Sequence, residues 1–222
     1  MKICKECATR WRCALGTISI ENGAVSNVTR ERRISKGEVL LRHGVQSKVL
    51  MVIKVGQVAC YRPGIDGKDR PLGLLSHGIS FGKLTLLGLS SIFTFVSTDQ
   101  GRICEVPIDV LKEHLPSRLG YIRLLALEQV RATELVADWA QVMQLQNVQA
   151  KVASALLLLT NMQGSHQIKM PTQTVLSHIL GIRRETIQRT MKEMSLRSEI
   201  THVDRSTYVV DREALVSYVD SD

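Results

Sequence analysis

The pattern of hydrophobic and polar positions changes character along the chain. From about residue 34 to 110, short runs of β-branched residues, such as residues 49–53, are separated by glycines, such as Gly56. Asp66 and Gly67 lie between two such runs and indicate a hairpin, because both central residues of the favoured two-residue turn adopt positive φ. This rhythm predicts an antiparallel β barrel or roll.

After Leu111 glycines become rare and the hydrophobic period lengthens to that of a helix. We expect a long amphipathic helix from about residue 117 to 145. Its apolar stripe recurs at heptad-like spacing and can pack on the β domain of its own chain or pair with a second copy. The stripe consists of Leu125, Ala132, Leu135, Trp139 and Val142.

The remaining residues predict a helix over 148–162 and then a pair of helices joined by a glycine. Thr172 can cap the first helix of the pair, and Gly181 can end it in the left-handed conformation that glycine tolerates. The second helix covers about residues 184–197, and two short strands with a turn between them follow over 200–210. This order is typical of a winged helix-turn-helix.

Long polar side chains occupy one face of the second helix of that pair. Arginine can contact guanine with two hydrogen bonds, glutamate accepts from the cytosine amino group, and glutamine pairs with adenine. We therefore expect this helix to read DNA, although charge alone would also fit a solvated surface helix. The candidate DNA-binding residues are Arg183, Arg184, Glu185, Gln188, Arg189 and Lys192.

Glu185 to Arg189 carries a specific resemblance. With Glu185 and Arg189 at its ends, it resembles the Glu-x-x-Ser/Gly-Arg motif of the Crp/Fnr family of bacterial transcription regulators, from which Gln188 departs. Arg184 resembles the Crp branch. The glycine pattern around Gly37, and that of residues 53–58 and 78–82, resembles the β-roll of the same family.

The resemblance implies an α+β fold. It consists of an N-terminal β-roll, which is a jelly roll of the cyclic-nucleotide-binding type, a long dimerisation helix and a C-terminal winged helix-turn-helix. The implied partners are a palindromic operator in double-stranded DNA, a second copy of the chain that pairs through the apolar stripe, and RNA polymerase. The implied divisions are a cysteine-rich cluster-binding segment at 1–18, the β-roll at 19–112, the dimerisation helix at 113–146 and the DNA-binding domain at 147–222.

The cyclic AMP site of the Crp branch is incomplete in this sequence. That site uses a glutamate just after a glycine of the roll and an arginine some ten residues later. Here Lys83 stands in place of the glutamate, and residues 89–97 contain no arginine. The ribose hydroxyl and the cyclic phosphate would lack their partners, so we expect no cyclic nucleotide as effector.

Three cysteines, Cys4, Cys7 and Cys13, lie close together near the start of the chain. Their spacing alone fits an iron–sulfur centre, a zinc site or incidental cysteines, and a cube of four irons needs four thiolates. The spacing resembles that of the Fnr branch, and the segment around Cys104 resembles the one that carries its distant fourth ligand. The resemblance therefore implies a [4Fe-4S] cluster on Cys4, Cys7, Cys13 and Cys104, whereas Cys60 is expected in the core.

Composition limits the remaining possibilities. The chain has 222 residues, 44% of them hydrophobic, and a net charge of +8, which is spread out except for a basic stripe from Arg183 to Arg197. The longest nearly apolar run, residues 152–160, is too short for a membrane span, and no secretory signal stands at the start, so we expect a cytoplasmic protein. Scattered histidines and the lack of a nucleophile motif argue against an enzyme.

The expected mechanism is oxygen or redox sensing. An intact cluster would pin the N-terminal segment to the β-roll and to the start of the long helix near residues 115–123, which favours the dimer and DNA binding. One alternative replaces the cluster by a dithiol/disulfide pair that includes Cys104. Another is an iron–sulfur electron carrier, which would leave the helix-turn-helix features of residues 166–210 unexplained.

Overall fold

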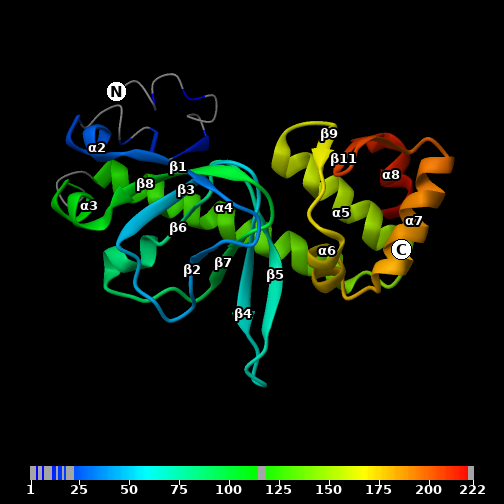
Figure 1. Cartoon of the computed structure of the whole chain (residues 1–222), viewed down its shortest axis with the longest axis horizontal. Coiled ribbons are helices and arrows are strands. Elements are labelled where there is room, and N and C mark those ends of the chain that lie inside the picture. The colour runs from blue at the N-terminus through cyan, green and yellow to red at the C-terminus, as the bar shows by residue number, and fades with distance from the viewer. Residues whose placement is uncertain are drawn as a thin grey trace.

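An antiparallel β domain, a long helix and a mainly helical C-terminal domain follow one another along the chain (Figure 1). The computed structural model describes residues 4, 7, 12, 13, 15, 16, 18, 23–114 and 119–219, and only the backbone of residues 119–121 and 124. Within these residues, none of the helices has the length and the apolar character that crossing a membrane requires.

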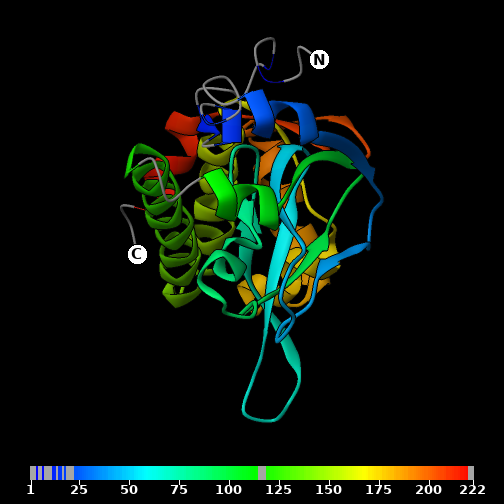
Figure 2. The same ribbon diagram turned by 90° about the vertical axis from the view of Figure 1, so that its left-hand side faces the viewer.

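The β domain contains two four-stranded sheets with the orders β1-β8-β3-β6 and β2-β7-β4-β5, and the pairings within both are antiparallel. The turned view in Figure 2 shows the β4–β5 hairpin extending away from the rest of the molecule. The strands are β1 (Arg30–Ile34), β2 (Val39–Leu41), β3 (Val49–Val55), β4 (Val58–Pro63), β5 (Asp69–Leu75), β6 (Ser80–Phe81), β7 (Thr94–Ser97) and β8 (Gly101–Pro107).

The predicted hairpin at Asp66 is confirmed, but its turn differs from the expected one. The loop spans residues 64–68 and closes with a 2.9 Å hydrogen bond from the Gly64 N–H to the Lys68 carbonyl. Gly67 has a φ of +72°, whereas Asp66 is not among the residues with positive φ, since Ser198 is the only one in the described part of the chain that is not a glycine. The longer loop therefore needs positive φ at one of these two positions and not at both.

The two sheets enclose an apolar core. Within it the rings of Phe81 and Phe95 stack with their centroids 4.6 Å apart. The Sγ of Cys60 is also buried there, 3.5 Å from the carbonyl oxygen of Gly73, as expected for a core cysteine. This core is what holds the two sheets face to face.

The helices include several that the sequence pattern did not predict. The first of these helices lie beside the roll, and the last ends the chain (Figure 1). The helices are α2 (Gly23–Val28), the 3₁₀ helix η2 (Lys83–Leu87), α3 (Ile108–His114), α4 (Leu119–Gln144), α5 (Val148–Gln163), α6 (Gln173–Leu180), α7 (Arg184–Leu196) and α8 (Arg212–Val219).

Two apolar side chains near the start of the chain belong to the core. Leu15, Gly16 and Ile18 are helical, and the side chains of Leu15 and Ile18 are buried. They belong to an apolar cluster that also contains Cys104 and, on α4, Leu125. Two apolar side chains of the predicted cysteine-rich segment are therefore core residues.

The apolar stripe of α4 packs on its own chain, which is the first of the two alternatives that the spacing left open. Leu125, Trp139 and Val142 are buried in the single chain, and Ala132 and Leu135 are partly buried against its cores. The three buried residues, which are predicted to lie in a dimer interface, thus make their apolar contacts within the single chain. The physical reason is that two surfaces of the same chain cover the stripe: Leu125 packs in the cluster of the β domain, and Val142 packs with Leu156 and Leu158 of α5.

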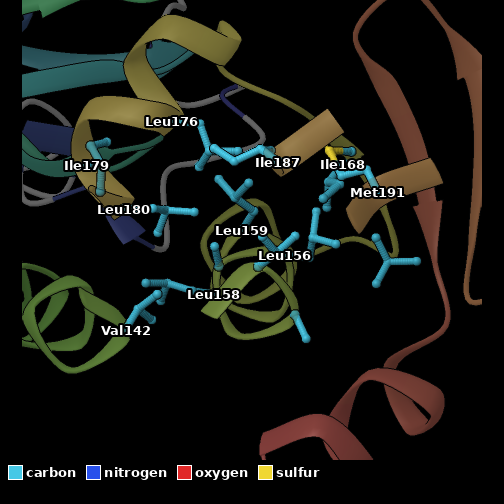
Figure 3. Packing of buried hydrophobic residues seen from close by; sticks show 14 of the residues in the cluster. Val142, Leu156, Leu158, Leu159, Ile168, Leu176, Ile179, Leu180, Ile187 and Met191 are labelled. Carbon is cyan, nitrogen blue, oxygen red and sulfur yellow. The ribbon is translucent and has the colours of Figure 1, made fainter. Parts of the chain in front are cut away.

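The C-terminal domain is built around α5 (Figure 3). Asn147 caps this helix, since its side chain accepts from the N–H groups of Gln149 and Ala150 at 2.8 and 3.3 Å. Figure 3 shows Leu156 and Leu159 of α5 surrounded by side chains of the neighbouring elements. The wing is a three-stranded sheet in the order β10 (Ile200–Asp204), β11 (Thr207–Val210), β9 (Gln167–Lys169), so the predicted hairpin gains a third strand.

The β domain and the C-terminal domain share one apolar cluster. Ala59 and Leu74 of the roll, Trp139 of α4 and Leu156 of α5 are all members of it. Polar contacts at the edge add to the junction: the Ser76 hydroxyl donates to the Met162 carbonyl at 2.9 Å, the Gln57 amide donates to the Lys169 carbonyl at 2.9 Å, and Lys169 pairs with Asp99.

Candidate nucleic-acid interface and cysteine site

Local hydrogen bonds fix the geometry of the two helices α6 and α7. The Thr172 hydroxyl accepts from the Val175 N–H at 3.2 Å and caps α6, as predicted. Gly181 ends the helix with a φ of +65°, and its N–H donates to the Ser177 carbonyl. Apolar packing between the helices then sets where the exposed face of α7 points.

The six candidate DNA-binding residues are all exposed. Helical spacing puts five of them on one side of α7, opposite the buried Ile187, Met191 and Met194. Arg183 occupies the N-cap position, where its backbone carbonyl accepts from the N–H groups of Thr186 and Ile187 but its side chain makes no capping bond. An arginine has no acceptor for a cap, so its guanidinium is left to project from the start of the helix.

The structure also joins two glutamines that the sequence did not connect. Gln188 on α7 donates from Nε2 to Oε1 of Gln173, the first residue of α6, at 2.6 Å. Both side chains are exposed. Their separation in sequence leaves no local pattern by which this contact could have been predicted.

The wing adds a basic residue that sequence reasoning missed. The Asp204 carboxylate accepts from the N–H groups of Ser206 and Thr207 at 2.9 and 3.0 Å, which closes the turn between β10 and β11. These bonds lower the pKa of Asp204. The turn holds Arg205 exposed at its tip.

A second group of residues gathers at the N-terminal end of the molecule. Cys4, Cys7 and Cys13 line one small pocket together with Cys104 of β8 and Lys54 of β3. The Gly16 N–H donates to the Cys13 sulfur at 3.3 Å. The structure therefore brings the four cysteines of the predicted ligand set together, although Cys104 is far from the others in sequence.

The pocket disfavours free thiolates. Burial raises the pKa of Cys13 to about 12, against the opposing effect of the Gly16 N–H. Burial also raises the pKa of Cys104 to about 11, against the opposing effect of the Lys54 charge. Cys13 and Cys104 therefore keep their protons at neutral pH unless another positive centre replaces them.

Four cysteines line the pocket, which is the type and number of ligands that the predicted cluster requires. A [4Fe-4S] cluster takes four cysteine thiolates, and four cysteines line this pocket. In the described part of the chain, no group of three or more His, Cys, Asp or Glu side chains is arranged to hold a metal ion.

A third feature is an apolar cavity between the roll and α4. Phe81, Phe93 and Phe95 contribute to its lining, and Lys83 stands in its wall. The ammonium of Lys83 lies 3.5 Å from the carboxylate of Glu128 on α4, which also accepts from the Ser80 hydroxyl. Burial lowers the pKa of Lys83, and Glu128 opposes this shift. Lys83 thus forms an ion pair with Glu128 of the same chain, and it stands at the position where the Crp branch has its glutamate.

Comparison with protein families divides the chain in the same way as its structure. Residues 31–117 match the family model described as a cyclic nucleotide-binding domain, and residues 150–218 match that of a Crp-like helix-turn-helix domain. Together the two matches cover most of the strands of the roll and the whole helix-turn-helix.

Similar proteins extend over nearly the whole length. A probable transcriptional regulator, flp, from Lacticaseibacillus casei is 21% identical over 197 residues, which cover 88% of this chain and 90% of the relative. The structure of FixK2 from Bradyrhizobium japonicum has a TM-score of 0.74 at 16% identity and covers 86% of this chain and 97% of its own. A CRP-family transcriptional regulator from Thermus thermophilus has a TM-score of 0.68 at 16% identity, with 85% and 96% covered. The predicted fold class is thereby confirmed.

Proposed function

Because the chain belongs to the Crp/Fnr family of transcription regulators, and is a regulator rather than an enzyme, we propose that it senses oxygen or redox state through a [4Fe-4S] cluster that controls its binding to DNA. The observation that carries this proposal is the shared pocket of Cys4, Cys7, Cys13 and Cys104. Four convergent cysteines are the ligand set of such a cluster. The target is a palindromic operator in double-stranded DNA.

Regulators of this family bind DNA and form dimers. In our proposal α7 enters the major groove, where Arg184, Glu185 and Arg189 contact base edges. We assign phosphate contacts to Arg183, Lys192 and Arg205. This is supported by their exposed positive charges, at the start of α7, on α7 and at the turn of the wing.

The dimer uses a different face of α4 from the one expected from the sequence. Ile122, Leu127 and Val130 are 50, 48 and 53% exposed in the single chain. With the exposed Ala126 and Ala137 they form a second apolar face along the helix. We assign the pairing of two chains to this face, since the first stripe is buried on the roll.

The chain itself links the cysteine pocket to α4. Leu15 and Ile18, which follow Cys13, pack in one cluster with Leu125 of α4, and the pKa of Cys13 responds to the charge of Glu128 on the same helix. The cluster, when bound, supplies an oxygen-sensitive centre that ties both cysteine segments together. Residues 115–118 of the expected contact near 115–123 lie outside the described residues, and the contact that supports the proposal is further along α4.

The other partners follow from this role. A regulator bound beside a promoter acts on RNA polymerase, so in our proposal the chain contacts RNA polymerase and works in the cytoplasm. In our proposal no cyclic nucleotide binds the roll, because Lys83 in the cavity wall is paired with Glu128.

The test is anaerobic reconstitution followed by counting of iron and sulfide. We expect about four irons per chain and a broad absorption band that bleaches in air as dimers dissociate. Cys104→Ser should lose the iron, whereas the matched variant Cys60→Ser should keep it, because Cys60 lies in the roll core. A chain that takes up no iron, or equal iron in both variants, would contradict the sensor.

The same pocket is also compatible with a second switch, a reversible disulfide. An N-terminal cysteine and Cys104 that share a pocket could also form a reversible disulfide, which consumes two thiols and needs no iron. Thiol counting with and without oxidant separates this dithiol/disulfide regulator from the cluster. An iron–sulfur electron carrier gives no role to the Crp-like helix-turn-helix at residues 150–218.

A further inference from the structure

The hydrogen bond between Gln173 and Gln188 has a consequence for DNA sequence preference. Gln188 lies on the exposed face of α7, one residue before Arg189 and three after Glu185. It is the residue at which the motif departs from the family pattern of serine or glycine. A 2.6 Å hydrogen bond runs from its Nε2 to Gln173 Oε1.

The backbone positions of the two glutamines are set by packing beneath them. Leu176 of α6 and Ile187 of α7 are buried in the same apolar cluster and are labelled close together in Figure 3. Within the turn, the Ser177 hydroxyl donates to the Ile182 carbonyl at 2.5 Å. Gln173 and Gln188 therefore project from two helices whose relative position is fixed, so their contact does not depend on long mobile segments.

The bond changes what Gln188 can recognise. A glutamine amide carries two N–H donors and one carbonyl acceptor. One N–H of Gln188 is committed to Gln173. What remains is one donor beside one acceptor, which matches N7 and the N6 amino group of adenine. Guanine presents two acceptors, N7 and O6, and a single remaining N–H cannot satisfy both.

We propose that Gln173 positions Gln188 to read adenine, and to reject guanine, at one base pair of the half-site. Gln188 is the residue that touches the base, and Gln173 acts through it. This inference rests on the proposed function, since it presupposes that α7 lies in the major groove. One good pair of hydrogen bonds to the base should give a preference for adenine over guanine on the order of tenfold.

The test is selection of binding sites from a DNA library with randomised half-sites, with the full chain in the same anaerobic preparation. The wild type should prefer adenine at one position by about tenfold over guanine. Gln188→Ala should lose the preference at that position alone and keep the preferences set by Arg184, Glu185 and Arg189. Gln149→Ala is the matched control, because Gln149 contacts α7 through Glu193, away from Gln173.

Two variants of Gln173 test the positioning role. Gln173→Ala frees the second N–H of Gln188, so the ratio of adenine to guanine should fall at the same position. Gln173→Glu keeps an acceptor for Gln188 and should restore that ratio, even if affinity falls equally on all sequences. A change in affinity without a change in the ratio for Gln173→Ala would overturn the positioning role.

The outcomes separate this inference from the proposed function. If Gln188→Ala leaves every base preference unchanged while the wild type binds specifically, the reading of adenine is wrong and the regulator stands. If the wild type selects no sequence at all, DNA reading by α7 is wrong, and this inference falls with it.

Discussion

The indole of Trp139 lies directly on the backbone of Gly73. A Cβ at Gly73 would stand 2.6 Å from Cδ1 of Trp139, closer than non-bonded atoms approach. The contact joins α4 to β5 and lies in the apolar cluster that the two domains share. The absence of a side chain at Gly73 is therefore what allows α4 to bury its tryptophan.

We predict that Gly73→Ala destabilises the fold by about 1–3 kcal/mol, because the added methyl group overpacks the contact with Trp139. The measurement is the urea midpoint of unfolding. Gly23→Ala is the control, since no atom lies within 4 Å of a Cβ there and Gly23 is helical, so that variant should be neutral or slightly more stable. Equal midpoints for Gly73→Ala and the wild type would contradict this prediction, because they would show that α4 shifts to accommodate the methyl group without loss of stability.

Loss of the guanidinium of Arg189 should weaken binding to the specific operator by about 1–3 kcal/mol and relax preference at one base pair. The exposed position of Arg189 on α7 is the reason for this expectation. Binding of Arg189→Ala is measured at fixed salt on the operator and on a scrambled duplex. Arg62→Ala removes an exposed charge from the roll instead and should leave the ratio of the two affinities unchanged.

A charge in the second apolar face of α4 should weaken the dimer. Val130→Glu places a carboxylate at a residue that is 53% exposed in the single chain and, in our proposal, buried between two copies. Sedimentation should detect a higher fraction of monomer. Ile65→Glu is the control at an exposed hairpin residue. Dimers of undiminished strength in Val130→Glu would exclude this face.

The pH dependence of stability should include a contribution from Glu38. The Ser35 N–H at 2.9 Å and the Arg32 guanidinium at 2.5 Å hold the pKa of Glu38 below its ordinary value of 4.5. Its stabilisation is therefore complete above pH 4.5 and is lost as the pH falls through the lower folded-state value.

Glu38→Gln should be less stable than the wild type at neutral pH by under about 1 kcal/mol, because the pair is partly exposed. The difference should disappear in acid. Unfolding midpoints across the acid range measure this, with Glu113→Gln at an exposed position of α3 as the control. A difference that persists at the lowest pH would assign the effect to something other than the charge.

The helix-turn-helix could be predicted because its boundary signals are local. Thr172 and Gly181 cap and end α6 through bonds to residues three or four positions away. The grouping of Cys104 with the N-terminal cysteines was also expected, but through a family resemblance and not through any local pattern. The structure supports that grouping by a shared pocket.

Other features depend on contacts that no local pattern encodes. The spacing of the α4 stripe is compatible both with packing on the roll and with pairing to a second copy of the chain. The lack of a side chain at Gly73 is one of the features that favour packing on the roll. Strand β9 has a single apolar residue, Ile168, which is buried and pairs with Tyr208 of β11. The bond between Gln173 and Gln188 likewise requires two helices to be in place first.

The shared apolar cluster limits how the two domains can be exchanged between related regulators. Ala59 and Leu74 of the roll, Trp139 of α4 and Leu156 of α5 pack together across the junction. A chimera joined at Asn147 would combine a Trp139 from one parent with the α5 surface of another, and would leave gaps or clashes in that cluster. Sequence changes on the two sides of the junction are therefore constrained to occur together.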